Sequence, residues 1–234
     1  MYLNTIIIDY RTTLEEISSL KKVCSNIIKT KKHLPLYDAI DGHPDIQVFS
    51  PCTSKAIIHK DAQYDFINSL TSQKIDVLLT EASLGATYPK NILLNAVSLK
   101  DYYIAALKFT DKSIIPFIDD KICINVNQGY TKCSTAIVSN KALITSDRSI
   151  IKALVPYDID VLEIPPGDIE LPGLNYGFIG GTCGLISEGE LAFFGSLEKF
   201  KYGDEILKFL IKHDVKPNYL SNSHLKDRGS IIRV

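Results

Sequence analysis

A short pattern that recurs along the 234-residue chain limits the folds open to it. Apolar runs end on serine at steps of 41 to 49 residues, at Val48-Phe49-Ser50, Val97-Ser98, Val138-Ser139 and Ile186-Ser187. Periods of roughly 20 to 50 residues are typical of folds that repeat one supersecondary unit. Three copies have the order strand, turn, strand, short helix, strand, and the copy around 92–107 is less regular. The pattern predicts ββαβ repeats in an α+β protein; unrelated hairpins in an α+β fold are the alternative.

The two ends of the chain supply the parts of one further, divided unit. A strand is expected over 229–234, where the next repeat would begin, and a β-rich run covers 5–9. Thr13 and Glu16 form a capping box, and apolar residues at helical spacing predict a helix over 14–29. Pairing the two ends would leave no repeat with an open flank. We therefore expect a ring closed by the N- and C-terminal strands.

Local patterns predict the other elements. Apolar runs separated by turn residues indicate strands. Asp61 and Asp147 precede short helices, which makes N-capping the expected role of both. A glycine-dense turn at 175–184 leads into a hairpin with its tip at Glu188-Gly189. The expected strands are 46–50, 55–59, 75–81, 92–98, 121–127, 134–138, 141–145 and 159–164; the expected helices are 61–70, 147–154 and 202–210; 101–107 is a strand or a helical turn, and 215–220 is irregular.

Composition narrows the function classes. A formal net charge of −1 gives no basic excess for nucleic acid or anionic membrane, and no apolar run approaches the roughly 20 residues of a membrane span. The first residues lack the pattern of a signal peptide. Five scattered cysteines without CxxC spacing argue against disulfides, and neither they nor the histidines have metal-ligand spacing. We expect one cytoplasmic domain over 1–234 without metal or cofactor; the oligomeric state stays open.

Three motifs then bring a known family into view. Val126–Cys133, Gly177–Gly181 and Asp227–Ile232 resemble an uncharacterised bacterial family assigned to the pentein, or guanidine-modifying-enzyme, fold. The resemblance covers nearly the whole chain and implies a five-bladed α/β propeller of ββαβ repeats. It also implies distant similarity to dimethylarginine dimethylaminohydrolase, arginine deiminase, agmatine deiminase and the amidinotransferases. In those enzymes carboxylates grip a guanidinium in the central channel, a cysteine attacks its carbon, and a histidine moves protons.

The catalytic pair of those enzymes has no counterpart at the matching positions. The histidine position falls near Gly129 or Tyr130, and the cysteine position falls at Gly229-Ser230. The preferred hypothesis is therefore a protein that binds a small polar molecule in the channel without the usual chemistry. A second hypothesis is an active amidinohydrolase or deiminase with a rearranged pair, and a third is a binding or assembly factor without a small ligand.

The candidate catalytic residues of the second hypothesis are Cys183, Cys133 and His43. By repeat symmetry all three occupy comparable turns and are expected to point toward one channel. Buried cysteines are more often small apolar fillers, and that interpretation is preferred for Cys133 and Cys183.

The candidate ligand-binding residues are polar groups near the same turns. Each has a plainer interpretation: a satisfied core amide for Asn95, and a solvated loop for the turn at 128–132. Asp227 and Ser230 end a repeat near the channel, and Phe178 belongs to the glycine-rich turn. The complete set is Asn95, Gln128, Tyr130, Lys132, Phe178, Asp227 and Ser230.

Overall fold

The computed structural model describes residues 5–234, which form a mixed α/β fold of five small sheets. Each sheet has three strands: an antiparallel pair, and a third strand parallel to the second. This is the ββαβ unit expected from the repeat. Four sheets come from consecutive segments: β3-β4-β5 (Val48–Cys52, Lys55–Ile58, Asp76–Leu79), β6-β7-β8 (Val97–Ser98, Tyr102–Ala105, Ile122–Asn125), β9-β10-β11 (Thr135–Ser139, Ala142–Thr145, Asp160–Glu163) and β12-β13-β14 (Cys183–Ser187, Glu190–Phe193, Lys216–Tyr219).

The remaining sheet, β15-β1-β2, which we count as the first, joins the two ends of the chain. The C-terminal strand β15 (Ile232–Arg233) runs antiparallel to β1 (Thr5–Ile8), with Ile7 opposite Ile232. On its other side β1 is parallel to β2 (Asn26–Lys29). The expected division of one repeat between the two ends is confirmed. Whatever the sequence predicts for residues 1–4 lies outside the described residues.

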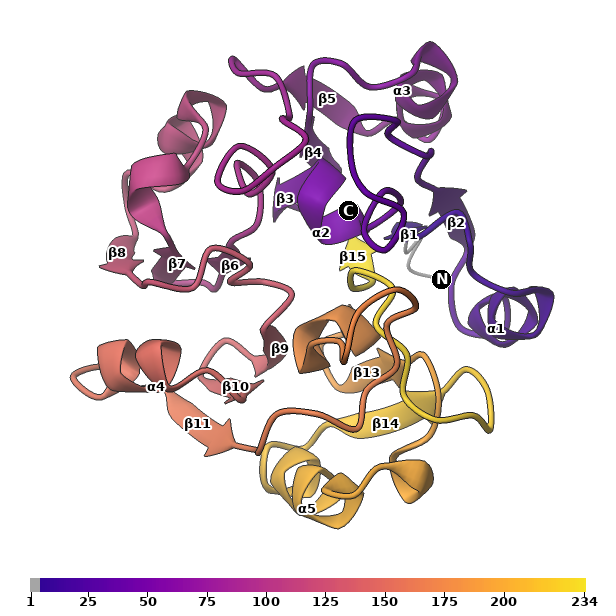
Figure 1. The fold of residues 1–234 in the computed structure, drawn as a ribbon, viewed down its shortest axis with the longest axis vertical. Helices are drawn as coiled ribbons and strands as arrows, with labels where there is room; N and C mark the ends of the chain where they lie inside the picture. Colours follow the sequence, from indigo (N-terminus) through magenta and orange to yellow (C-terminus); the bar gives the residue numbers. More distant parts are fainter. Residues whose placement is uncertain (1–4) are drawn as a thin grey trace.

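Helices carry the chain from the second to the third strand of four sheets. Parallel neighbours need such a crossover because a tight turn cannot join them. In the third sheet two 3-10 helices, η1 (Leu107–Phe109) and η2 (Lys112–Phe117), take this place. Figure 1 shows the long crossover helices at the outside, with β3, β6, β9 and β15 near the centre. The crossover helices are α1 (Leu14–Leu20), α3 (Tyr64–Thr71), α4 (Arg148–Leu154) and α5 (Gly203–Lys212).

The apolar core is divided into wedges between neighbouring sheets. Five clusters of buried residues lie between neighbouring sheets. Four of them combine side chains of two sheets that follow each other in the sequence, and the fifth combines the last sheet with the first. All four residues of β1 are buried, which is why the strand reads as a continuous apolar run. Residues that belong to the same cluster from the two sides of a boundary are, beginning from the first sheet, Ile7 and Val48, Phe49 and Tyr103, Ile104 and Leu143, Val138 and Leu191, and Ile186 and Ile8.

Two of the three expected helix N-caps are present in the structure, and one is not. Thr13 and Glu16 make the full capping box of α1, and Asp147 accepts hydrogen bonds from the first amides of α4. Asp61 caps no helix, because α3 begins later and has Gln63 at its N-cap.

The expected helix over 14–29 is wrong in its second half. The helix α1 ends at Leu20, and Asn26–Lys29 is the strand β2. Ile27 and Ile28 continue the helical spacing by coincidence, but as β-branched residues they also suit a strand. Pairing with β1 decided between the two.

Four other segments differ from expectation. Residues 216–219, expected to be irregular, are β14, an outer strand that tolerates Pro217 because an edge strand leaves amides unpaired. Only Val97–Ser98 of the expected strand 92–98 is a strand, and only Ile232–Arg233 of 229–234. A helical turn, α2 (Pro44–Gln47), replaces the start of the strand expected at 46. These non-strand segments turn polar side chains toward the centre.

No helix within residues 5–234 is long and apolar enough to cross a membrane.

The sheet that joins the chain ends is expected to be essential for stability. Ile7 is fully buried between β15 and β2. Ile7→Ala should lower the free energy of unfolding by about 2–5 kcal/mol, because it removes apolar contacts and leaves a cavity. Ile211→Ala on α5, where the side chain is 64% exposed, is the control and should change it by about 0.5 kcal/mol or less. Urea denaturation measures both, and equal losses would contradict the central position of β1.

Candidate functional site

We call β3, β6, β9, β12 and β15 the inner strands. Polar residues stand two or three positions before four of them. Asp45 precedes β3 by three residues, and Asn95, Cys133 and Ser230 precede β6, β9 and β15 by two. The inner strands start around one centre, so these residues gather from distant parts of the sequence (Figure 1). We call this group, with His43, Lys132 and Asp227, the polar centre.

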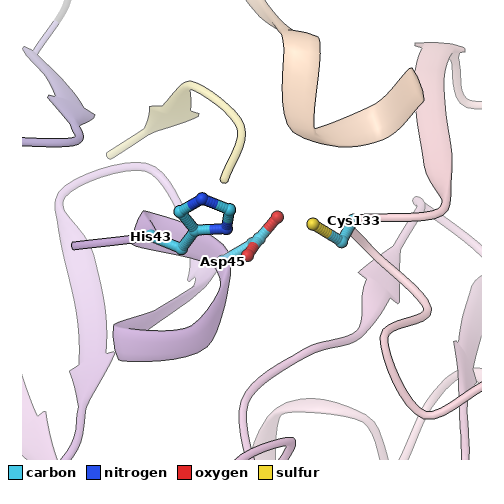
Figure 2. Close-up of side chains that lie close together, drawn as sticks. All are labelled: His43, Asp45 and Cys133. Carbon is cyan, nitrogen blue, oxygen red and sulfur yellow. The ribbon is translucent and has the colours of Figure 1, made fainter. Parts of the chain in front are cut away.

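His43, Asp45 and Cys133 lie close together. One ligand-type atom of each, an imidazole nitrogen, a carboxylate oxygen and the sulfur, lies within 4.8 Å of the others. Figure 2 shows His43 and Asp45 projecting from the start of α2 toward Cys133, which comes from the segment before β9. All three are buried, at 0%, 1% and 3% exposure. Side chains from two segments far apart in the sequence thus lie together in the buried interior.

Asp227 holds the loops around this group. Its carboxylate accepts hydrogen bonds from the amides of Phe178, at 2.8 Å, and Gly229, at 2.9 Å. It also lies 3.7 Å from the Cys133 sulfur and 3.8 Å from Nδ1 of His43. Burial raises the pKa of Asp227, the His43 imidazole lowers it, and the Asp45 carboxylate raises it further.

Ser230 connects the polar centre to a lysine. Its Oγ lies 2.9 Å from Oδ2 of Asp45, 2.7 Å from the Gly180 carbonyl oxygen and 3.0 Å from Nζ of Lys132. One hydroxyl proton serves one acceptor at a time, so Ser230 accepts from the lysine and donates to Asp45 or to Gly180. Ser230 has φ 73°, a conformation that costs a non-glycine residue about 1–2 kcal/mol. This strained backbone places the hydroxyl among its three partners.

Gly181 provides the space for Asp227. A Cβ atom at residue 181 would stand 1.9 Å from Oδ1 of Asp227, far inside van der Waals contact. The carbonyl oxygen of Gly181 also accepts hydrogen bonds from the amides of Arg228 and Ser230, at 3.0 and 2.9 Å. The glycine-rich turn thus has a definite function: it admits the C-terminal segment and its carboxylate.

A cavity of about 700 Å³ lies beside the polar centre and is lined by all five inner strands. Its walls include Phe49, Leu185 and Ile232, and its mouth carries the hairpin residues Lys141 and Glu188. His43, Asp45 and Cys133 do not line it, whereas Lys132 belongs to both the cavity wall and the polar centre. We call it the axial cavity, because all five inner strands line it.

Two positively charged residues that line this cavity form no ion pair with other described residues. Within residues 5–234 neither Lys132 nor Arg233 forms an ion pair, although both are only partly exposed. Lys141 at the mouth is different, because it is exposed and pairs with Asp158. The wall therefore has unpaired positive charge at Lys132 and Arg233.

The structure divides the predicted binding residues into two groups. Asp227, Ser230 and Lys132 lie in the polar centre. Asn95 is buried there too, but as a satisfied core amide: Oδ1 accepts from the amides of Lys132 and Cys133, and Nδ2 donates to the Asp45 carbonyl oxygen. Asn95 does not line the axial cavity.

The other three predicted binding residues have structural partners. Gln128 donates to Asp147 at 2.8 Å and accepts from the Tyr130 amide at 3.1 Å, which shapes their turn. The Tyr130 hydroxyl accepts from Asn91 at 2.8 Å. Phe178 contributes its backbone amide to Asp227. None of these three side chains lines the axial cavity.

Of the two candidate cysteines, Cys133 lies beside His43 and Cys183 does not share that group. The Cys183 sulfur contacts the Ile179 carbonyl oxygen at 3.5 Å, and burial raises the pKa of its thiol to about 11. Burial, and then the charges of Asp227 and Asp45, raise the pKa of Cys133 well above its ordinary value. Both thiols are therefore protonated at neutral pH and poor nucleophiles as they stand.

Asp45 is the main residue that the sequence analysis did not select. It stands in the segment Asp41–Asp45, which carries no distinguishing motif. The usable signal was its position, since Asn95, Cys133 and Ser230 all stand just before strands that the repeat aligns. Arg233 was missed for a similar reason, as its role follows from lining a cavity shared by five strands.

Comparison with known proteins places the fold. The model of a family of unknown function (DUF6873) matches residues 7–232. No curated protein matches the sequence significantly. Solved structures are similar at low identity, so their likeness concerns the fold alone.

Three of the similar structures are enzymes of guanidine chemistry. A dimethylarginine dimethylaminohydrolase variant with a histidine changed to glycine, in an adduct with S-methyl-L-thiocitrulline, has a TM-score of 0.56 and 11% identity over 100% of both chains. The Pseudomonas aeruginosa dimethylarginine dimethylaminohydrolase, a cysteine-to-serine mutant with citrulline, has 0.54 and 12% over 95% of this chain and 94% of that one. SxtG, an amidinotransferase of saxitoxin biosynthesis from Microseira wollei, has 0.52 and 9% over 97% and 89%. The expected pentein-fold similarity is confirmed.

The cysteines should separate by accessibility. Cys52 and Cys123 are exposed, whereas Cys24, Cys133 and Cys183 are buried. We expect Ellman's reagent to titrate two thiols quickly in the native protein and the other three only after denaturation, because burial blocks access and disfavours the thiolate. A third fast thiol that disappears in Cys133→Ser would show that the polar centre is open to solution.

The fit of Asp227 against Gly181 should be measurable as stability. Gly181→Ala should cost about 1–3 kcal/mol, because the added methyl group overlaps the carboxylate. Gly189→Ala is the matched control at a hairpin tip, where the nearest atom to the new Cβ is the Asp214 carbonyl oxygen at 3.6 Å. Chemical denaturation compares the two variants, and equal stability would contradict the tight contact.

Proposed function

This chain belongs to the family of unknown function DUF6873, and we propose that it is a closed five-bladed pentein protein that binds a small carboxylate-bearing molecule in its axial cavity. Two contacts support the closed ring. The strand β1 pairs with β15, and one apolar cluster joins the last sheet to the first. A cytoplasmic location is part of the proposal, because the five cysteines are free thiols, as in a reducing compartment.

The unpaired cations of the cavity are the observation that carries the proposal. Lys132 and Arg233 line it without any ion-pair partner in the described chain. A charge that is partly removed from water is stabilised by an opposite charge, so an anionic group of a bound molecule would complete the site. Lys132 is the stronger anchor, because Ser230 already orients its ammonium group.

The cavity also limits the rest of the molecule. Its volume of about 700 Å³ lies within the range of small-molecule sites, and much of its wall is apolar, as at Phe49 and Leu185. The solved Pseudomonas relative holds citrulline, which combines a carboxylate with a planar ureido group. An amino acid with a guanidino or ureido side chain is therefore the class that we propose for this chain.

Binding without the usual turnover is the preferred form of the proposal. The positions matched to the catalytic pair are occupied by Gly129 or Tyr130 and by Gly229-Ser230. Gly229 packs against His43, where an added Cβ would stand 2.3 Å from the histidine Cβ, so this segment is closely packed. An assembly factor with a plugged channel has less support, since the channel has an open volume.

Thermal shift tests the proposal with matched compounds. Arginine and citrulline should raise the melting temperature, whereas agmatine, which lacks the carboxylate, should not. At a concentration about 100-fold above Kd the gain is about 2.7 kcal/mol, or roughly 5–10 °C for a chain of this size. The absence of a shift with any guanidino, ureido or other amino acid would contradict it.

Two lysine variants locate the binding group. Lys132→Met should raise Kd roughly 10- to 100-fold, because a charge-assisted hydrogen bond contributes about 1.5–3 kcal/mol. Lys141→Met, at the mouth of the same cavity and paired with Asp158, is the control and should leave Kd nearly unchanged. Isothermal titration with citrulline measures both; equal effects would move the carboxylate site away from Lys132.

One arrangement favours a second candidate function, hydrolysis of a guanidine compound by Cys133. The thiol lies beside His43 and Asp227, the residue types that serve as base and orienting acid in thiol enzymes. Release of ammonia or citrulline from arginine-type substrates would support this function if it disappears in Cys133→Ala. Activity that persists in that variant would remove the mechanism.

A further inference from the structure

We propose that His43, Asp45 and Cys133 bind a divalent metal ion, zinc by the chemistry of the three side chains, at the polar centre. This inference goes beyond the proposed function and does not rest on it, because none of the three residues lines the axial cavity. The sequence analysis predicted no metal, since the three residues lack ligand spacing along the chain.

The distances suit a small ion. Zinc lies about 2.0–2.3 Å from nitrogen, oxygen and sulfur ligands, so tetrahedral ligand atoms stand roughly 3.3–3.8 Å apart. The three candidate atoms lie within 4.8 Å of one another, and the Asp227 carboxylate lies 3.7 Å from the Cys133 sulfur and 3.8 Å from Nδ1 of His43. An inward movement of about 1 Å or less by each side chain would complete three bonds. Asp227 is placed to act as a fourth ligand or to orient the others.

Two of the three proposed ligands, His43 and Asp45, carry buried atoms without a hydrogen-bond partner among the described residues. Neither ring nitrogen of His43 has a hydrogen-bond partner among the described residues, and Oδ1 of Asp45 has none. The other oxygen of Asp45 is bound by Ser230. Buried polar atoms are nearly always partnered, so a group of them that converges on one point calls for an explanation. A metal ion would satisfy an imidazole nitrogen and the carboxylate oxygen together.

Charge and ligand type select the class of ion. A thiolate, an imidazole and a carboxylate form a mixed set of the kind that suits zinc, whereas calcium and magnesium prefer oxygen alone. Asp45, Asp227 and a Cys133 thiolate would carry three negative charges. A divalent cation would balance two of these buried charges without the Lys132 ammonium group, which the proposed function assigns to a bound carboxylate. This balance is the reason for a divalent ion.

The surrounding contacts would hold the ligands in place. Asn95 binds the amide of Cys133 and the carbonyl oxygen of Asp45, which fixes the two segments relative to each other. The Asp45 amide in turn donates to the Gly229 carbonyl oxygen at 3.0 Å. Such outer contacts orient ligands in natural metal sites. A metal ion here would tie the segments before β3, β9 and β15 together at the centre of the fold.

Metal analysis of the purified full chain tests the inference directly. After removal of metals with EDTA, the protein should take up about one zinc per chain at ~1 µM free zinc, and its melting temperature should rise. The cobalt form should show a near-ultraviolet charge-transfer band of a thiolate–metal bond. No zinc uptake, or cobalt binding without the thiolate band, would overturn the proposal, and both measurements use the unaltered protein.

Variants then assign the ligands. Cys133→Ser should abolish the cobalt–thiolate band, and Asp45→Asn should raise the zinc Kd at least 10-fold. Cys183→Ser is the matched control, because this cysteine is equally buried at the start of the next inner strand but contacts a carbonyl oxygen instead. It should retain both the zinc and the band. Loss of the band in Cys183→Ser but not in Cys133→Ser would overturn the assignment.

Discussion

The pairing of β1 with β15 is the interaction on which the rest of the structure depends. It is short, with Ile6 opposite Arg233 and Ile7 opposite Ile232, yet it joins the two ends of the chain in one sheet. When β15 joins this sheet, it brings with it the segment that precedes it in the chain. That segment carries Asp227 and Ser230 into contact with residues of the second and fourth repeats. Without this pairing the polar centre would lose the Asp227 carboxylate and the Ser230 hydroxyl group.

The centre of the fold combines two unlike regions along one axis. On one side the inner strands line a largely apolar cavity with unpaired cations; on the other their starting segments form a buried group rich in acidic and sulfur side chains. Lys132 belongs to both, and Ser230 links its ammonium group to Asp45. Electrostatic effects are strong in such a place because water is largely excluded. A change of charge on one side therefore changes the electrostatic potential on the other.

Residue patterns close to one another along the chain were sufficient for much of the fold. The capping box of α1, the cap at Asp147 and the hairpin tip at Glu188-Gly189 all depend on contacts within a few residues. The strands β2 and β14 were missed because local patterns pointed elsewhere: a helical period at Ile27 and Ile28, and a proline at 217. In both cases hydrogen bonds to a strand distant in the sequence outweighed local preference.

The sequence by itself determined the repeat, the divided unit and the likeness to the pentein fold, because each copy carries its own alternation of strands and helix. It also indicated His43, Cys133, Asp227 and Ser230 as candidates, through their places in equivalent turns. Only the tertiary structure decided that Cys133 rather than Cys183 lies beside His43, that Asp45 joins them, and that Asn95 serves the backbone. The physical reason is that a side chain's neighbours, where the five sheets come together, belong to other sheets. Their distance depends on how all five sheets pack, and no single stretch of the chain contains that information.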